Sequence, residues 1–560
     1  MQNTCTQCST TFEITDSDLA FYDAISPIFN GKKELVPPPT QCPNCRKRRR
    51  LAWRNERTLY HRKCDLTGKQ VISVFSPDKP FKVYRQQDWW TDKWDAMSYG
   101  RDFDFSRPFF DQYAELLMEV PCMNVIGEAN ENCDYCNLIA NCKDCYLVFE
   151  SSNNEDCLYG YWLQKCDDCC DVSFSHESRF CYEVDNCYNC HQLSWSQNCT
   201  NCHSSAFLYD CIGCSNCLFS TNLRQKEYCI LNEQYSKEDY EKKYAEFYTG
   251  SHAAVQEMKK IFREFLLKQP HRAAQMINAE NCTGDYVQSS KNCRECYHAH
   301  EAEDCTFGEH VWRGSRSNMD VSTVGRDAEM IYEAINTGIG SKNNLFTIQC
   351  WSGTNDLLYC YDCFSSHHCF GCSGMKQKSY CIFNKQYTKE EYEELVPKII
   401  EHMRKTNEYG EFFSADKSLF AYNETVAHES FPLTKEEVMK RGWQWREDDV
   451  AENQYLGPIS DIPDDIRTVD DAICKQILLC EVTNKPYKII PQELKFYREM
   501  KLPIPRLCPD ERHKERMIQR NPQKLWERKC ANCSKDIQTT YAPDRTEIVY
   551  CEDCYLSTVY

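Results

Sequence analysis

Pairs of cysteines separated by two residues lie at both ends of this chain. Such pairs supply two thiolates from one tight turn, and two pairs together complete the tetrahedral site that zinc prefers, with Zn–S bonds of about 2.3 Å. We therefore predict one structural zinc ion at each end. An iron–sulfur centre and reduced, metal-free thiols are the alternatives. The predicted ligands are Cys5, Cys8, Cys42 and Cys45 at the N-terminal end, and Cys530, Cys533, Cys551 and Cys554 at the C-terminal end.

Further cysteines recur through the centre of the chain at two regular steps, a shorter one as from Cys136 to Cys145 and a longer one as from Cys145 to Cys157. If two steps make one coil of a solenoid, cysteine pairs that lie two steps apart stack on adjacent coils and supply four thiolates. This spacing predicts further zinc sites, while buried thiols that pack as small hydrophobic groups, or disulfides, are the alternatives. The predicted array ligands are Cys142, Cys145, Cys166, Cys169, Cys187, Cys190, Cys211 and Cys214.

A basic segment follows the second cysteine pair. Residues 41–63 hold nine Lys and Arg against one acid, in a protein whose net charge is −18. Such a cluster, with Trp53 and Tyr60 interleaved, favours phosphate and base contacts, but the same arginines can instead pair with carboxylates of the protein itself. The candidate nucleic-acid ligands are Arg46, Lys47, Arg48, Arg49, Arg50, Arg54 and Arg57.

The composition restricts the class of protein. The chain has 560 residues and 40 cysteines. It begins without an apolar signal region and contains no apolar run of membrane-spanning length. We therefore expect a cytoplasmic protein with reduced cysteines and no membrane partner. No common catalytic motif is present, so an enzyme is the less favoured interpretation, although an enzyme or redox protein with an open thiolate site stays an alternative.

The two ends are diverged copies of one module with two metal sites. A shift of 475 places Cys5 on Cys480, and a shift of 466 places Cys42 on Cys508 and Cys64 on Cys530. The copies have lost opposite sites. In the N-terminal copy the second site reads Cys64, Thr67, Arg85 and Asp88, and in the C-terminal copy the first site reads Cys480, Thr483, Cys508 and Glu511.

Short β-prone segments with Asn and Asp turns predict many short strands between the modules. One coil is expected to span two cysteine steps, as from Cys145 to Cys169. Capping residues predict helices after Ser106, Ser236 and Thr388, and apolar spacing predicts one over 253–268. The expected domains are a double ribbon (1–95), a linker helix (96–121), a first array (122–235), a helical segment (236–281), a second array (282–387), a helix with a wrapping linker (388–473) and a second double ribbon (474–560).

The motif Cys5-x-x-Cys8-x-x-x-Phe12, with Phe21-Tyr22 and Cys42-Pro-x-Cys45-Arg46, resembles the probable zinc-ribbon domain family, a treble-clef-like module of unassigned function. The C-terminal motif, Cys530-x-x-Cys533 with Val549-Tyr-Cys-x-x-Cys554-Tyr555, is similar to short zinc domains of uncultured small-genome bacteria, and the whole layout resembles cysteine-rich proteins of those bacteria. These motifs cover about a third of the chain. The resemblance implies zinc binding and no enzymatic activity.

We therefore predict a mainly β protein with α appendages, in which terminal zinc-ribbon or treble-clef-like modules flank two cysteine-laddered, β-solenoid-like arrays. The predicted role is that of a structural or interaction scaffold that binds zinc. The alternative is an RNA- or DNA-binding factor that uses the basic segment. The partner is accordingly a protein or a nucleic acid, and the oligomeric state is left open.

Overall fold

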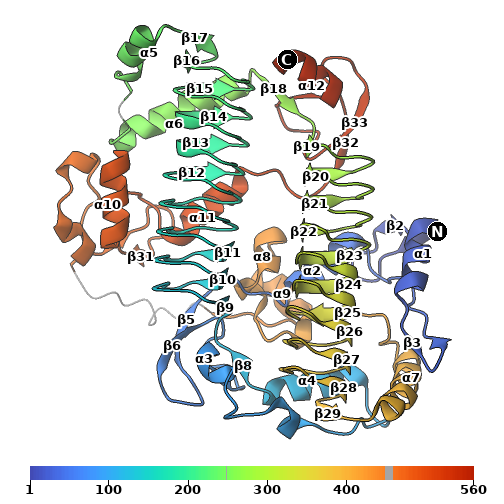
Figure 1. Ribbon diagram of the computed structural model, residues 1–560. Helices are drawn as coiled ribbons and strands as arrows, with labels where there is room; N and C mark the ends of the chain where they lie inside the picture. Colours follow the sequence, from blue (N-terminus) through green and yellow to red (C-terminus); the bar gives the residue numbers. More distant parts are fainter. Residues whose placement is uncertain (248, 448–457) are drawn as a thin grey trace. The chain divides into compact units, whose positions relative to one another are not determined.

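The computed structural model describes residues 1–247, 249–447 and 458–560 (Figure 1). The chain forms two compact units, and each contains one terminal module and one solenoid. Unit 1 comprises residues 1–125, 274–447 and 523–525, and unit 2 comprises residues 126–273, 448–522 and 526–560. The N-terminal module thus packs with the second array, and the C-terminal module packs with the first.

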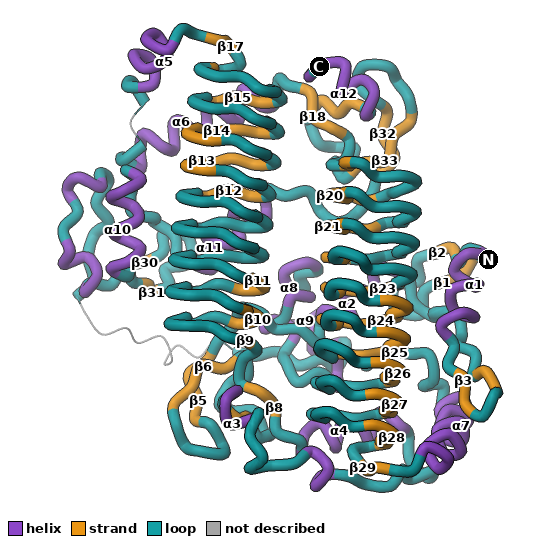
Figure 2. The backbone as a smooth tube through the Cα atoms, in the orientation of Figure 1, coloured by secondary structure: helices purple, strands orange, loops and turns teal. Residues whose placement is uncertain are grey.

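Each array is a solenoid of very short parallel strands, and this confirms the predicted fold class (Figure 2). In the first array nearly every third residue from Ala129 to Leu231 has a positive φ, near +50°. Such a residue turns the chain sharply. One residue of each triplet points inward, the next pairs with the neighbouring coil, and the third makes the turn. Four triplets close one coil.

The predicted coil length of two cysteine steps is wrong. Asn137 pairs with Phe149, and the side chain of Asn154 accepts a hydrogen bond from the backbone of Cys166 on the next coil. Each coil of the first array therefore spans a sequence separation of 12, and several coils of the second array span 13, as between Asn318 and Ile331. The longer cysteine step, as from Cys145 to Cys157, was predicted to be half a coil, but it is one whole coil.

The strands of the first solenoid form two sheets, parallel throughout except for the final hairpin. They are β9 (Gly127–Glu128), β10 (Asn137–Ala140), β11 (Phe149–Ser152), β12 (Tyr182–Asp185), β13 (His191–Gln197), β14 (His203–Tyr209), β15 (Leu218–Thr221), β16 (Cys229–Ile230) and β17 (Glu233–Gln234).

The second solenoid is one sheet of 11 strands, which also ends in an antiparallel hairpin. Its strands are β19 (Met276–Ile277), β20 (Gly284–Gln288), β21 (Cys296–His300), β22 (Glu309–Val311), β23 (Met319–Val324), β24 (Glu329–Thr337), β25 (Lys342–Ile348), β26 (Asn355–Leu358), β27 (His367–Phe370), β28 (Ser379–Ile382) and β29 (Lys385–Gln386).

A helix follows the last hairpin of each solenoid, as predicted. Ser236 caps α5 (Lys237–Tyr244), and Thr388 forms a capping box with Glu391 at the start of α7 (Lys389–Lys405). The helix expected over 253–268 is α6 (His252–Leu266). The helix expected after Ser106 is α4 (Phe109–Glu119), which begins later because Ser106 bonds to Asp104 and Pro108 occupies the N-cap. None of the described helices is long and apolar enough to cross a membrane.

Both terminal modules are built from short hairpins, each followed by a helix. The N-terminal elements are β1 (Gln2–Thr4), β2 (Thr11–Glu13), α1 (Asp16–Ile25), β3 (Ile28–Phe29), β4 (Lys32–Lys33), α2 (Pro43–Leu51), β5 (Tyr60–Lys63), β6 (Gln70–Ser73), β7 (Val83–Tyr84), α3 (Gln86–Trp89), η1 (Ala96–Tyr99) and β8 (Cys122–Met123). The C-terminal elements are β30 (Leu478–Leu479), β31 (Pro486–Tyr487), α10 (Pro491–Met500), α11 (Pro509–Ile518), β32 (Trp526–Lys529), β33 (Asp536–Thr539), β34 (Ile548–Tyr550) and α12 (Glu552–Val559).

The segment predicted as a wrapping linker contains residues 448–457, which lie outside the described residues. Its described part holds η2 (Ala415–Lys417), η3 (Tyr422–Glu424), α8 (Val426–Ser430), α9 (Lys435–Lys440), η4 (Ile466–Thr468) and η5 (Asp471–Lys475). The remaining strand, β18 (Pro270–Arg272), follows α6 and pairs in parallel with β34 of the C-terminal module.

Candidate metal centres

The four cysteines predicted at the N-terminal end lie together. Their sulfur atoms are all within 4.8 Å of one another, and the Sγ atoms of Cys8 and Cys42 are 3.7 Å apart. A tetrahedron with Zn–S bonds of about 2.3 Å has edges of about 3.8 Å. The spacing of these sulfurs therefore fits a tetrahedrally bound metal ion, and the predicted grouping is confirmed.

Two local structures supply these ligands. Cys5 and Cys8 lie on the turn between β1 and β2, where Ser9 donates its N–H to the carbonyl of Cys5 (2.9 Å) and has a φ of 61°. Cys42 is the N-cap of α2, and Cys45 lies in its first turn. A hairpin turn combined with the first turn of a helix is the treble-clef arrangement, one of the two modules predicted from the sequence.

The C-terminal cluster repeats this construction. Cys530, Cys533, Cys551 and Cys554 also lie within 4.8 Å of one another, and the Sγ atoms of Cys533 and Cys551 are 3.7 Å apart. Ser534, with a φ of 62°, closes the turn by donating to the carbonyl of Cys530 (2.9 Å). Cys551 is the N-cap of α12, so this second pair also begins a helix.

In each cluster the surroundings stabilise one cysteine as the thiolate, the form that binds metal, while the pKa of at least one neighbouring thiol is raised. A hydrogen bond from Cys45, acting against burial, lowers the pKa of Cys42 to about 5. Burial acts to raise the pKa of Cys530, but hydrogen bonds from the backbone N–H groups of Cys533 and Cys551 outweigh it and lower the pKa to about 6. The positive N-terminal ends of α2 and α12 act in the same direction.

The second site of the N-terminal module is filled by an ion pair. The guanidinium Nε of Arg85 lies 2.8 Å from the carboxylate of Asp88, and the Thr67 hydroxyl donates to the same carboxylate (3.4 Å). The backbone N–H of Arg85 donates to the sulfur of Cys64 (3.2 Å). The four positions predicted from the duplication therefore lie together, and their own charges balance without a metal ion.

The predicted stacking of the array pairs does not occur, because cysteine pairs two steps apart lie two coils apart. Cys142 and Cys166, for example, are then roughly 10 Å apart, twice the spacing of neighbouring strands. Among the described residues, no three array thiols lie within 4.8 Å of one another. The eight array cysteines predicted as ligands are all buried: Cys142, Cys145, Cys166, Cys169, Cys187, Cys190, Cys211 and Cys214.

The array thiols instead bond to backbone carbonyls within the narrow core. The thiol of Cys157 lies 3.3 Å from the carbonyl of Glu155 and 3.4 Å from that of Cys166 on the next coil. Burial raises the pKa of Cys187 and Cys211 well above the usual value, so both stay protonated. These contacts correspond to one of the alternatives that the sequence left open, in which small buried thiols fill the core.

The basic segment after the first cluster lies against the second solenoid. Arg46 and Arg50 are each 1% exposed and face Asp320, which is itself fully buried. Arg46 Nη2 lies 2.8 Å and Arg50 Nη1 3.3 Å from its carboxylate. Arg49 pairs with Glu333 at 3.1 Å and Lys47 pairs with Glu309 at 3.0 Å.

The other three arginines predicted as nucleic-acid ligands are also partly or fully buried. The side chain of Arg54 donates to the hydroxyl of Thr323 (2.6 Å) and pairs with Glu56. Arg48 stacks over the ring of Trp443, and Arg57 is half-buried. These contacts favour the intramolecular interpretation of the basic segment, and nucleic-acid binding stays a prediction without support from the site.

The C-terminal module repeats this docking on the first solenoid, which was not predicted from the sequence. The shift of 466 places Arg46 and Arg50 on Arg512 and Arg516. Their guanidinium nitrogens lie 2.7 and 2.5 Å from the two carboxylate oxygens of Asp171, which is fully buried. Arg520, the counterpart of Arg54, pairs with Asp185 at 2.9 Å. The arginines that the two copies share at equivalent positions were the sequence signal from which this docking could have been predicted.

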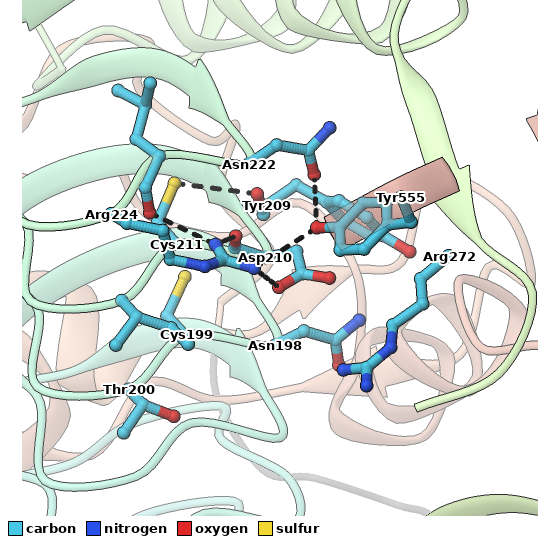
Figure 3. Close-up of polar contacts among 12 residues, drawn as sticks. Asn198, Cys199, Thr200, Tyr209, Asp210, Cys211, Asn222, Arg224, Arg272 and Tyr555 are labelled. Carbon is cyan, nitrogen blue, oxygen red and sulfur yellow. Dashed lines mark hydrogen bonds and ion pairs between the residues drawn. The ribbon is translucent and has the colours of Figure 1, made fainter. Parts of the chain in front are cut away.

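The C-terminal cluster is tied to the first solenoid through the residue after its last ligand (Figure 3). Tyr555 follows Cys554 and is fully buried. Its hydroxyl donates to the side chain of Asn222 (2.9 Å) and accepts from Arg224 (3.3 Å), which in turn pairs with Asp210 (3.1 Å). The start of α12 thus carries two cysteines of the candidate metal centre and also contacts the solenoid.

The sequence matches no known protein-family model, and a comparison with curated proteins finds no match. The assignment of the clusters therefore depends on their geometry alone.

Proposed function

We propose that this protein is a scaffold whose two terminal modules are each held together by one structural zinc ion. The observation that supports this is the pair of four-cysteine clusters, whose sulfur spacing of 3.7 Å fits the edge of a ZnS4 tetrahedron. Zinc is favoured over iron because each cluster combines a turn with the first turn of a helix, as structural zinc domains do. Each set of four thiolates leaves no open position for a substrate, which favours a structural role.

Each module packs against one solenoid and is anchored there by buried arginines. The solenoids offer their remaining faces to a partner, which we propose to be a protein. Exposed corners carry regular ladders of amides, as between Asn189 and Asn201, whose side chains are 2.8 Å apart on adjacent coils. We place this function in a reducing compartment such as the cytoplasm, where the free cysteines stay reduced.

Metal analysis of the full chain, purified without added metal, tests the proposal. We expect two or more zinc ions per chain and no iron. Replacing Cys533 with Ser is expected to remove one zinc ion, while Cys474→Ser, which changes a thiol outside every cluster, leaves the zinc content unchanged. Protein without metal, or a visible iron–thiolate absorption, contradicts the zinc assignment.

Chelation gives a second readout. Because apo zinc modules lose most of their stability, removal of zinc is expected to increase hydrogen exchange in α2 and α12 while the central coils of both solenoids stay protected. Uniform protection before and after chelation would show that the clusters do not hold the modules together.

A further inference from the structure

The first site of the C-terminal module keeps the backbone of a metal site although two of its four cysteines are replaced. Asn484 donates its N–H to the carbonyl of Cys480 (2.8 Å) with a φ of 57°, as Ser9 does to Cys5 in the intact N-terminal site. Cys508 is the N-cap of α11, with φ and ψ of −65° and 160°, and Cys42 caps α2 with −66° and 160°.

The donor atoms of this site are also spaced as in the intact one. The hydroxyl oxygen of Thr483 lies 3.9 Å from the sulfur of Cys508, and the equivalent atoms in the intact site, the sulfurs of Cys8 and Cys42, lie 3.7 Å apart. Cys480 and Cys508 are 1% and 4% exposed. The Thr483 hydroxyl and the Cys508 thiol therefore keep the spacing of the intact site, and the Cys480 thiol stays buried on the same turn as Thr483.

The two altered sites differ in charge. In the N-terminal module Arg85 brings a guanidinium into the altered site, and this cation pairs with Asp88. In the C-terminal module the replacements are a neutral hydroxyl and a carboxylate, Thr483 and Glu511. The four side chains of that site thus offer only donors to a cation and include no cation of their own.

Glu511 lies in the first turn of α11, at the position that Cys45 has in α2. Its carboxylate pairs with Lys514 at 3.6 Å, and the Lys514 side chain is 64% exposed. The Glu511 side chain is 17% exposed. A pair with one solvent-exposed partner at this distance contributes little, about 1 kcal/mol, so the carboxylate can exchange this contact for one with the thiols. Carboxylate oxygens are ordinary zinc ligands.

We propose that Cys480, Cys508 and Glu511 bind a third zinc ion, with the fourth position taken by a water molecule beside the Thr483 hydroxyl. Three protein ligands with one exchangeable position distinguish this site from the two closed four-cysteine clusters. The ion holds β30, β31 and α11 together, and it remains accessible to a small ligand that can replace the water.

Zinc titration of the full chain in the presence of a chromophoric chelator tests this site. We expect the wild type to bind one more zinc ion than Cys508→Ser. The matched control is Cys64→Ser, which removes the one thiol of the site that the Arg85–Asp88 pair fills, and it is expected to keep the wild-type zinc content. Equal zinc content in the wild type and Cys508→Ser overturns the proposal.

Glu511→Gln keeps both thiols and so tests the site if Cys508→Ser does not fold. It is expected to weaken the binding of one zinc ion at least tenfold and leave the others unchanged. With Co²⁺ as the probe, the same variant is expected to alter the visible bands of one bound ion. If Glu511→Gln leaves every affinity unchanged, the carboxylate is no ligand and the proposal fails. Two zinc ions in all variants overturn the third site and leave the proposed function intact, whereas no zinc in any variant contradicts both.

Discussion

Asp171 is the carboxylate of the first solenoid that binds two arginines of the C-terminal module. It is fully buried, and both of its oxygens are bonded, one to Arg512 at 2.7 Å and the other to Arg516 at 2.5 Å. The substitution Asp171→Asn keeps the shape of the side chain and removes its charge. The two guanidinium groups are each at most 6% exposed. Arg512 then keeps one carboxylate partner, Glu493 at 3.2 Å, and Arg516 keeps only neutral ones, the Ser173 hydroxyl and the Tyr159 carbonyl.

Two separate estimates give a similar free-energy cost for Asp171→Asn. Hydrogen bonds to charged groups contribute about 1.5–3 kcal/mol each. Asn keeps one accepting oxygen, so one bond is lost and the other is weakened, at a cost of about 2–5 kcal/mol. Removal of one partner from a buried ion pair costs about 3–5 kcal/mol, because the other charge stays buried without compensation. We therefore expect Asp171→Asn to destabilise the packing of α11 on the first solenoid by about 3–5 kcal/mol.

Native-state hydrogen exchange of the zinc-loaded chain measures this loss locally, which suits a protein of two units that need not unfold in one step. The amides of α10 and α11 are expected to lose protection by the stated amount, while those of α2 in the other module keep theirs. Asp167→Asn is the matched control, because Asp167 is 40% exposed and pairs with the exposed Arg179 in the same solenoid. Its expected effect is below about 1 kcal/mol.

Two results would refute the reasoning. An exposed ion pair contributes up to about 1 kcal/mol. If Asp171→Asn changes the protection of α11 by less than this amount, the buried pairing of Asp171 does not hold the C-terminal module on the solenoid. If Asp167→Asn costs as much as Asp171→Asn, the effect belongs to the charge of the solenoid in general and not to the docking site.

Three further predictions concern other parts of the chain. The triple variant Thr67→Cys, Arg85→Cys and Asp88→Cys replaces the ion pair with three thiols beside Cys64, and metal analysis is expected to find one more zinc ion than in the wild type; an unchanged content would show that the altered backbone no longer fits a metal. Burial raises the pKa of the Asp362 carboxyl well above its usual range, so the folded state holds a proton that the unfolded chain releases above about pH 4. The stability of the wild type is therefore lost as the pH rises. In urea unfolding, the free energy of unfolding of Asp362→Asn relative to that of the wild type is expected to rise by about 1.4 kcal/mol per pH unit above pH 4. A difference that does not change with pH contradicts this prediction. Cys199→Leu overfills a coil in which Cys199 is fully buried and is expected to cost about 1–3 kcal/mol in the same assay, whereas Cys199→Ala is expected to cost less; the reverse order would mean that the core has free space.

The terminal clusters were predictable because all their information is local. Each knuckle is a single tight turn, and the helix that follows Cys42 begins with a proline at its first position, so spacing alone places the four ligands. The altered sites were predictable from the duplication. The ion pair by which Arg85 and Asp88 fill one of these sites could not be predicted, because it depends on side-chain contacts that the alignment of the two copies does not reveal.

The coil length was mistaken because the chain turns far more often than Gly and Pro indicate. The residues with positive φ are mostly not glycine, and many are Asn or Asp directly before an inward cysteine, such as Asn132, Asp144, Asp156 and Asn189. Asn and Asp tolerate this conformation better than other residues with side chains. The repeated Asn-Cys and Asp-Cys dipeptides were thus the signal for a turn at every triplet and for a coil of four triplets.

This geometry also explains why the arrays use cysteine. A coil of four triplets, with one inward side chain from each, leaves a narrow core, in which each inward residue has another directly above and below it at about 4.8 Å. A thiol is small and apolar, yet it can donate weakly to a carbonyl. Cys202, fully buried, does so to Thr200 at 3.5 Å and to Cys211 on the next coil at 3.3 Å. Serine is similar in size to cysteine but more strongly polar, and valine is apolar but has no hydrogen-bond donor. In the arrays, the cysteine spacing that resembles a metal-binding pattern therefore results from the packing of the narrow core. At the two ends of the chain, a turn and the start of a helix bring four sulfurs together, so that the same residue type could bind a metal ion.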